Sequence, residues 1–120
     1  MHRFVFAVVA AAIPLAACGA DGASPVDPNP GPVVTSAVVQ ATPADQFTPA
    51  TINLAVGGSI EFDFGAVAHN VFFDDAPSGA PANIAAPSFN TRVSRTFTTT
   101  GRFVYNCHLH PGMKGVVVVQ

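Results

Sequence analysis

Four side chains in the C-terminal half of the chain are of types that bind soft metal ions. Cys107, His110 and Met113 follow one another at intervals of three residues, and His69 lies well upstream. A thiolate, two imidazoles and a weak axial thioether form the donor set of type 1 (blue) copper sites, whose chemistry is electron transfer. Thiolate and thioether favour Cu(I), whereas imidazole suits Cu(II), so one ion can change oxidation state in this mixture. The four side chains therefore predict one type 1 copper per chain.

The segments around these side chains are expected to be strands that bring the ligands to one point. Tyr105 and Cys107 share one face of a strand, and Pro111–Gly112 then turn the chain back into a valine-rich strand over residues 114–120. A loop this short makes its three ligands converge. His69 begins another short strand, which brings the second imidazole to the same place.

The remaining chain from residue 33 onward consists of short β-like runs separated by turn signals. Further strands are expected at residues 33–40, 52–56, 60–64 and 92–98, with a tight hairpin turn at Gly57-Gly58 and a loop over residues 74–88. The composition agrees, since it is 49% apolar and only 10% charged, with 10 Gly and 11 Pro. We expect an all-β, two-sheet antiparallel Greek-key sandwich over residues 34–120.

The N-terminus has the features of a targeting segment. Residues 1–17 carry a positive start at Arg3 and an apolar stretch, and they end before Cys18 in a Leu-Ala-Ala-Cys sequence that resembles the bacterial lipobox. An ordinary secretory signal that leaves Cys18 free is the alternative. Residues 18–33 are rich in Pro, Gly and Ala and are expected to form a flexible tether. These features predict an extracytoplasmic, membrane-anchored lipoprotein, in the periplasm or on the outer cell surface, lipidated at Cys18.

Residues 36–120 resemble the cupredoxins. The Cys-x-x-His-x-x-Met spacing that starts at Cys107 is close to the short ligand loop of amicyanin and shorter than that of plastocyanin, and His69-Asn70-Val71 matches the upstream ligand segment. The resemblance implies that Asn70 ties the ligand loop by hydrogen bonds. It also implies that His110 reaches the surface through an apolar patch, where the donor and acceptor redox proteins dock.

His108 is a departure from the cupredoxin motif. The sequence Cys-His-Leu-His, in which it stands, also resembles the corresponding segment of multicopper oxidases. Their trinuclear cluster needs several more histidines, and this chain has four, of which His2 lies in the predicted signal. Alternation along the strand points His108 away from Cys107, so a surface histidine is expected.

The expected function is that of a lipid-anchored electron carrier between extracytoplasmic redox proteins, and not an enzyme. The competing interpretation is a copper storage or delivery protein with the same ligands. Delivery favours exposed, exchangeable ligands, and a thiolate at the end of a strand is expected to be buried. A net charge of -2 offers no basic surface for nucleic acid. We expect a monomer.

Overall fold

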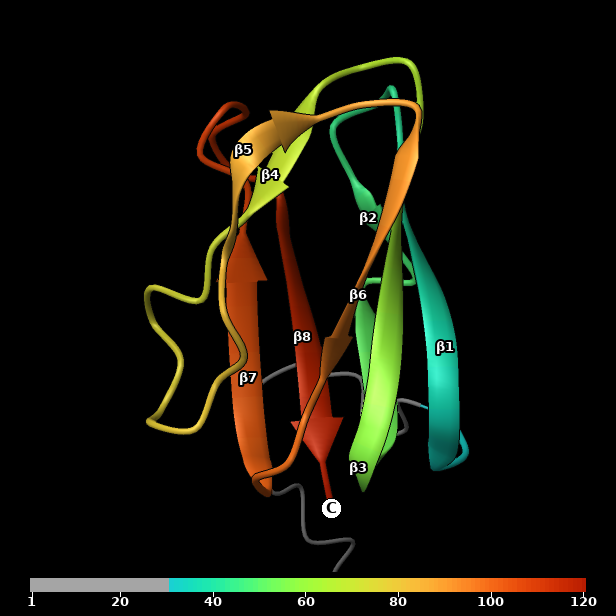
Figure 1. The fold of residues 1–120 in the computed structure, drawn as a ribbon, viewed down its shortest axis with the longest axis vertical. Helices are drawn as coiled ribbons and strands as arrows, with labels where there is room; N and C mark the ends of the chain where they lie inside the picture. The colour runs from blue at the N-terminus through green and yellow to red at the C-terminus, as the bar shows by residue number, and fades with distance from the viewer. Residues whose placement is uncertain (1–30) are drawn as a thin grey trace, which may run out of the picture.

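The computed structural model describes residues 31–120, so the predicted signal peptide, Cys18 and nearly all of the predicted tether lie outside the described residues. The described residues form strands and no helix, which confirms the all-β prediction (Figure 1). The strands are β1 (Val34–Ala41), β2 (Phe47–Thr48), β3 (Thr51–Phe64), β4 (His69–Val71), β5 (Ile84–Ser88), β6 (Thr91–Thr96), β7 (Gly101–Asn106) and β8 (Lys114–Val119). Within this part of the chain, no helix is present that could cross a membrane.

The strands form one large and one small sheet. The large sheet has the order β2-β1-β3-β8-β7, with β6 also paired to β3, and β4 pairs with β5 in the small sheet. Not every pairing is antiparallel as predicted, because β3 runs parallel to both β1 and β8. In Figure 1 the small sheet lies at the upper end of the molecule, beside the loop that joins β7 to β8. This end carries the predicted ligands.

The predicted hairpin at Gly57-Gly58 is wrong, because β3 continues through both glycines as a single 14-residue strand. Its first part pairs with β8, and its part from Ser59 onward pairs with β6. Gly57 has a φ of 83°, and a Cβ on Gly58 would lie 2.7 Å from the carbonyl oxygen of Thr35. The glycines therefore allow an irregularity within a strand instead of a chain reversal. The predicted loop over residues 74–88 also contains a strand, β5.

Aromatic side chains from strands of the large sheet pack against one another in the core. The Tyr105 ring packs edge-to-face against Phe47 and Phe62, with centroid distances of 4.9 and 5.3 Å. Tyr105 is 1% exposed, as expected for a core residue, and it lies two residues before Cys107 on the same face of the chain. Edge-to-face pairs favour one relative orientation of the rings, so this packing fixes the end of β7 from which Cys107 emerges.

Removal of the Tyr105 hydroxyl is expected to stabilise the protein. The oxygen is buried and has no hydrogen-bond partner among the described residues, and burial raises the pKa of the hydroxyl far above 10.0, so it stays protonated. A buried polar group without a partner costs free energy, and Tyr105→Phe is therefore expected to raise the free energy of unfolding by about 1 kcal/mol. Urea unfolding of the metal-free protein measures this change. Tyr105→Leu is the control and should destabilise, because it also removes the ring. A loss of stability in Tyr105→Phe would contradict the prediction.

Candidate metal centre

His69, Cys107 and His110 come together at the upper end of the sandwich. His69 opens β4 and is 0% exposed, Cys107 follows the last residue of β7 and is 3% exposed, and His110 lies in the loop before β8. Their potential ligand atoms all lie within 4.8 Å of one another. The Cys107 Sγ is 3.9 Å from Nδ1 of His69 and 3.7 Å from Nδ1 of His110, and the two Nδ1 atoms are 2.9 Å apart.

These distances suit a metal bound by one thiolate and two imidazoles. Ligand bonds of about 2.0–2.1 Å to nitrogen and about 2.3 Å to sulfur, spread by about 110–120°, separate the ligand atoms by roughly 3.4–3.8 Å. The sulfur–nitrogen distance to His110, 3.7 Å, lies within this range, and the distance to His69, 3.9 Å, lies just beyond its upper end. The nitrogen–nitrogen distance is shorter and has the length of a hydrogen bond, so a bound ion would separate the two rings slightly. The donor set of one sulfur and two nitrogens fits copper.

The loop between Cys107 and Met113 is held by two backbone hydrogen bonds. The Cys107 N–H donates to the Met113 carbonyl over 3.0 Å, and the Met113 N–H donates to the His110 carbonyl over 3.1 Å. Gly112 lies in the left-handed region with a φ of 88°, which glycine adopts without steric cost. The loop is therefore closed on itself at the point where the chain enters β8.

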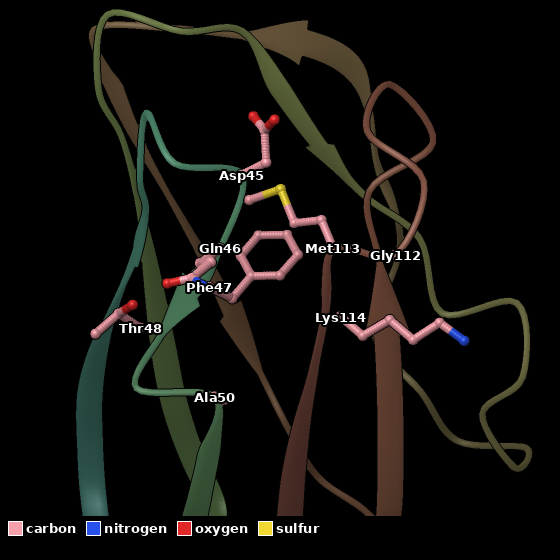
Figure 2. Close-up of a pocket in the computed structure, with 8 residues that line it drawn as sticks. All are labelled: Asp45, Gln46, Phe47, Thr48, Ala50, Gly112, Met113 and Lys114. Atoms are coloured by element: carbon pink, nitrogen blue, oxygen red, sulfur yellow. The ribbon is translucent and has the colours of Figure 1, made fainter.

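Met113, the predicted axial ligand, is 2% exposed. Figure 2 shows its side chain extending from the residue just before β8, over the ring of Phe47 and toward the turn that carries Asp45. It lines a pocket of about 350 Å³ together with residues 45–48, Ala50, Gly112 and Lys114. The thioether thus lies at the metal end of the sandwich, and its bond to the metal stays a prediction.

The outer nitrogen of His69 fixes how this ring faces the cluster. His69 Nε2 lies 2.9 Å from the carbonyl oxygen of Thr42, which can only accept, so we infer that Nε2 carries the proton and Nδ1 has a free lone pair. Burial, the largest cause, lowers the pKa of His69, and nearby His110 lowers it further, although the Thr42 carbonyl and Asp45 act in the opposite direction. A neutral ring with its lone pair on Nδ1 is the form that binds a metal.

Asn70 connects the two segments that supply the ligands. This residue is 4% exposed, and its Oδ1 accepts a hydrogen bond of 2.7 Å from the backbone N–H of His108. The contact joins β4 to the residue directly after Cys107, which is the kind of tie that the resemblance implied for Asn70. Because the amide is buried, this hydrogen bond is shielded from competing water.

His108 is a surface residue, as its position in the alternation predicted. Its ring stacks on Phe72 with a centroid distance of 3.6 Å and an interplanar angle of 8°, and its Nε2 lies 2.5 Å from Oδ2 of Asp74. Its side chain is 43% exposed. The ring is thus held on the outside of the molecule, away from the cluster. No local pattern could indicate this arrangement, because Asp74 lies 34 residues before His108 in the chain.

The turn between β1 and β2 also contacts the cluster and had no signal in the sequence. Thr42 contacts the outer nitrogen of His69, and Oδ1 of Asp45 lies 3.5 Å from Nε2 of His110. Neither residue belongs to a motif that names a metal site, and both lie far from their partners in the sequence. No pattern in the sequence could have identified them.

The comparisons with known proteins agree with this geometry. Residues 34–120 match the family described as copper binding proteins, plastocyanin/azurin family. Among solved structures, a copper-containing nitrite reductase from Thermus scotoductus SA-01 is 27% identical with a TM-score of 0.62, and the match covers 71% of this chain and 22% of the reductase. A reduced amicyanin variant is 30% identical with a TM-score of 0.59, over 71% of this chain and 82% of amicyanin. No curated protein sequence gives a significant match.

The chain therefore belongs to the plastocyanin/azurin family of copper-binding proteins, the cupredoxins. The match to this family and the cluster of His69, Cys107 and His110 together show a protein that binds one copper per chain. A second amicyanin structure, the reduced Cu(I) form of another variant at pH 4, is 25% identical with a TM-score of 0.60 and covers 78% of this chain and 95% of amicyanin. The match thus covers nearly all of that amicyanin chain but only about a fifth of the nitrite reductase.

Proposed function

We propose that the protein is a blue copper electron carrier. His69, Cys107 and His110, with Met113 as a weaker ligand, would hold one copper, which would supply single-electron transfer between redox proteins through its Cu(I) and Cu(II) states. The observation that carries this proposal is the placement of the Cys107 thiol within 3.9 Å of two imidazole Nδ1 atoms. The family match and the likeness to amicyanin support it.

Burial of the ligands favours an electron carrier over a copper delivery protein. His69 is 0%, Met113 2% and Cys107 3% exposed, whereas the side chain of His110 is 26% exposed. Delivery requires that an acceptor can replace the ligands one by one, which buried side chains hinder. Electron transfer needs only that one ligand reaches the surface, and His110 does. The same burial opposes an enzyme, since a substrate would need access to the metal.

The surface around His110 is the proposed docking site for the donor and the acceptor. Leu109 is 43% exposed, and the neighbouring Pro111 and Gly112 are also exposed. Brief encounters suit a carrier that must release each partner, and a small, partly apolar contact provides them. We further propose that the protein is a monomer, anchored outside the cytoplasm by a lipid on Cys18. The lipobox-like sequence before Cys18 and the proline-rich segment after it support this localisation.

Titration of the copper-free protein with Cu(II) tests the proposed function. We expect an intense blue absorption band from the thiolate–Cu(II) bond, a narrow copper hyperfine splitting in the EPR spectrum and saturation at one copper per chain. Ascorbate should bleach the band reversibly, and mixtures of the Cu(I) and Cu(II) protein should exchange electrons fast enough to broaden NMR signals near His110.

His108→Ala is the matched control, because it removes an imidazole next to Cys107 that does not face the cluster. It should bind copper with the same spectrum. Colourless copper binding, or rapid loss of the ion to a mild chelator, would contradict the electron carrier and favour copper delivery.

A further inference from the structure

Asp45 lies in the tight turn between β1 and β2, at the same end of the molecule as the ligands (Figure 2). The Thr42 N–H donates to the Gln46 carbonyl over 2.9 Å, and the Asp45 N–H donates to the Thr42 carbonyl over 3.1 Å. Asp45 has a φ of 57°, in the left-handed region, which Asp and Asn tolerate better than other residues with a side chain. The turn therefore places this carboxylate at a defined position.

This one turn contacts the outer nitrogens of both histidines. The Thr42 carbonyl lies 2.9 Å from Nε2 of His69, and Oδ1 of Asp45 lies 3.5 Å from Nε2 of His110. The second distance is longer than the roughly 3.2 Å limit of an ordinary N–H···O hydrogen bond, so the contact is chiefly electrostatic. His69 thus faces a neutral acceptor, and the more exposed His110 faces a full negative charge.

We propose that Asp45 is a positioning residue that orients the His110 ring and favours Cu(II) over Cu(I). The inference rests on the proposed function. When His110 binds the metal through Nδ1, the ring proton resides on Nε2 and points toward Asp45. The negative charge of a carboxylate that faces this N–H attracts positive charge on the ring and the metal, which stabilises the more highly charged metal ion. Oxidation releases one electron to the partner and adds one positive charge at the copper, while Asp45 gains and loses nothing.

The size of the effect follows from exposure. The side chain of Asp45 is 50% exposed, so water screens much of its charge. We therefore expect removal of the charge to change the equilibrium constant for reduction by about three- to tenfold, which is roughly 30–60 mV at 59 mV per tenfold for one electron.

Asp45→Asn in the full-length protein tests the inference. Asparagine keeps the shape of the side chain, an oxygen that faces Nε2 and the tolerance for a left-handed φ, and it removes only the charge. Redox titration followed at the blue band should show a higher reduction potential, with the equilibrium constant shifted three- to tenfold toward Cu(I). The thermal unfolding midpoint of the copper-free protein should stay close to that of the wild type. A residue with a merely structural role would lower this midpoint and would not shift the potential alone.

Asp74→Asn is the matched control. The Asp74 carboxylate is similarly exposed and also contacts a histidine, but that histidine is His108, which does not face the cluster. A shift in Asp45→Asn that is no larger than the shift in Asp74→Asn, or a change of less than about 1.5-fold, would overturn the role of Asp45, because a charge beside a ligand must act more strongly than one beside a surface ring. The proposed function would survive that result. It would fail separately, if the wild-type protein gave no blue band.

Discussion

Replacing Cys107 with serine is expected to abolish the blue band of the Cu(II) protein and leave the fold in place. The band needs a thiolate bonded to copper, and a serine hydroxyl at this position does not ionise near neutral pH. Cys107 is 3% exposed and its Sγ faces two imidazole nitrogens, so no other thiol among the described residues can take its place. Copper affinity should fall by more than the roughly 10- to 100-fold that loss of an outer-shell contact costs.

The fold should tolerate this change because the two side chains are close in size. A buried free cysteine behaves as a small apolar residue, and the serine hydroxyl can hydrogen bond to either histidine in its place. Circular dichroism and thermal unfolding of the copper-free variant check the fold, and absorption and EPR spectra check the site. A blue band that persists in Cys107→Ser would show that Cys107 is not the thiolate ligand, and the assignment of the whole site would then be wrong.

Gly115→Ala is expected to be the most destabilising single-methyl substitution near the site. Gly115 of β8 pairs with Tyr105 of β7, and an added Cβ would lie 2.2 Å from the Tyr105 hydroxyl oxygen and 2.3 Å from Cζ of the same ring. The ring cannot move aside easily, because Phe47 and Phe62 pack edge-to-face against it. Overpacking of a core commonly costs 1–3 kcal/mol, and we expect about 3 kcal/mol here.

Thermal unfolding of the copper-free protein measures this loss. For a domain of this size, about 3 kcal/mol corresponds to a fall of roughly 12–24 °C in the unfolding midpoint. Gly65→Ala is the matched control, since the nearest atom to its Cβ would be the Ala41 carbonyl oxygen at 4.0 Å, and it should unfold close to the wild type. Equal unfolding midpoints for the two variants would contradict the prediction, because they would show that β7 and β8 make room for the added methyl group without loss of stability.

Most of the metal cluster could be predicted from the sequence because its residues are local. Cys107 and His110 lie on one short loop, where three-residue spacing and a Pro-Gly turn leave few ways to arrange the side chains. The structure brings both to His69 and places the Cys107 thiol close to the two imidazoles. Local chemistry was sufficient here, since a thiol, two imidazoles and a thioether at this spacing suit few purposes other than binding a soft metal ion.

The fold was predictable to the level of its class. Alternating apolar residues and frequent turn formers predicted strands and no helix, which the described residues confirm. The same signals failed at Gly57-Gly58, where the glycines mark an irregularity inside β3 and not a hairpin. A glycine pair allows either outcome, and the partners available on β1, β6 and β8 decide which one forms. Those partners lie too far along the chain for a local pattern to identify them.

The amino-acid sequence by itself determined the chemical character of this protein: the donor atoms, the short ligand loop and the tendency to form a sandwich of strands. The tertiary structure alone decided how the ligands are oriented and what surrounds them. Thr42 and Asp45 face the outer nitrogens of His69 and His110 only because the turn after β1 folds over the metal end. The reason is physical, since donor type belongs to a single residue, whereas ring orientation and local charge arise from contacts between segments that the fold brings together.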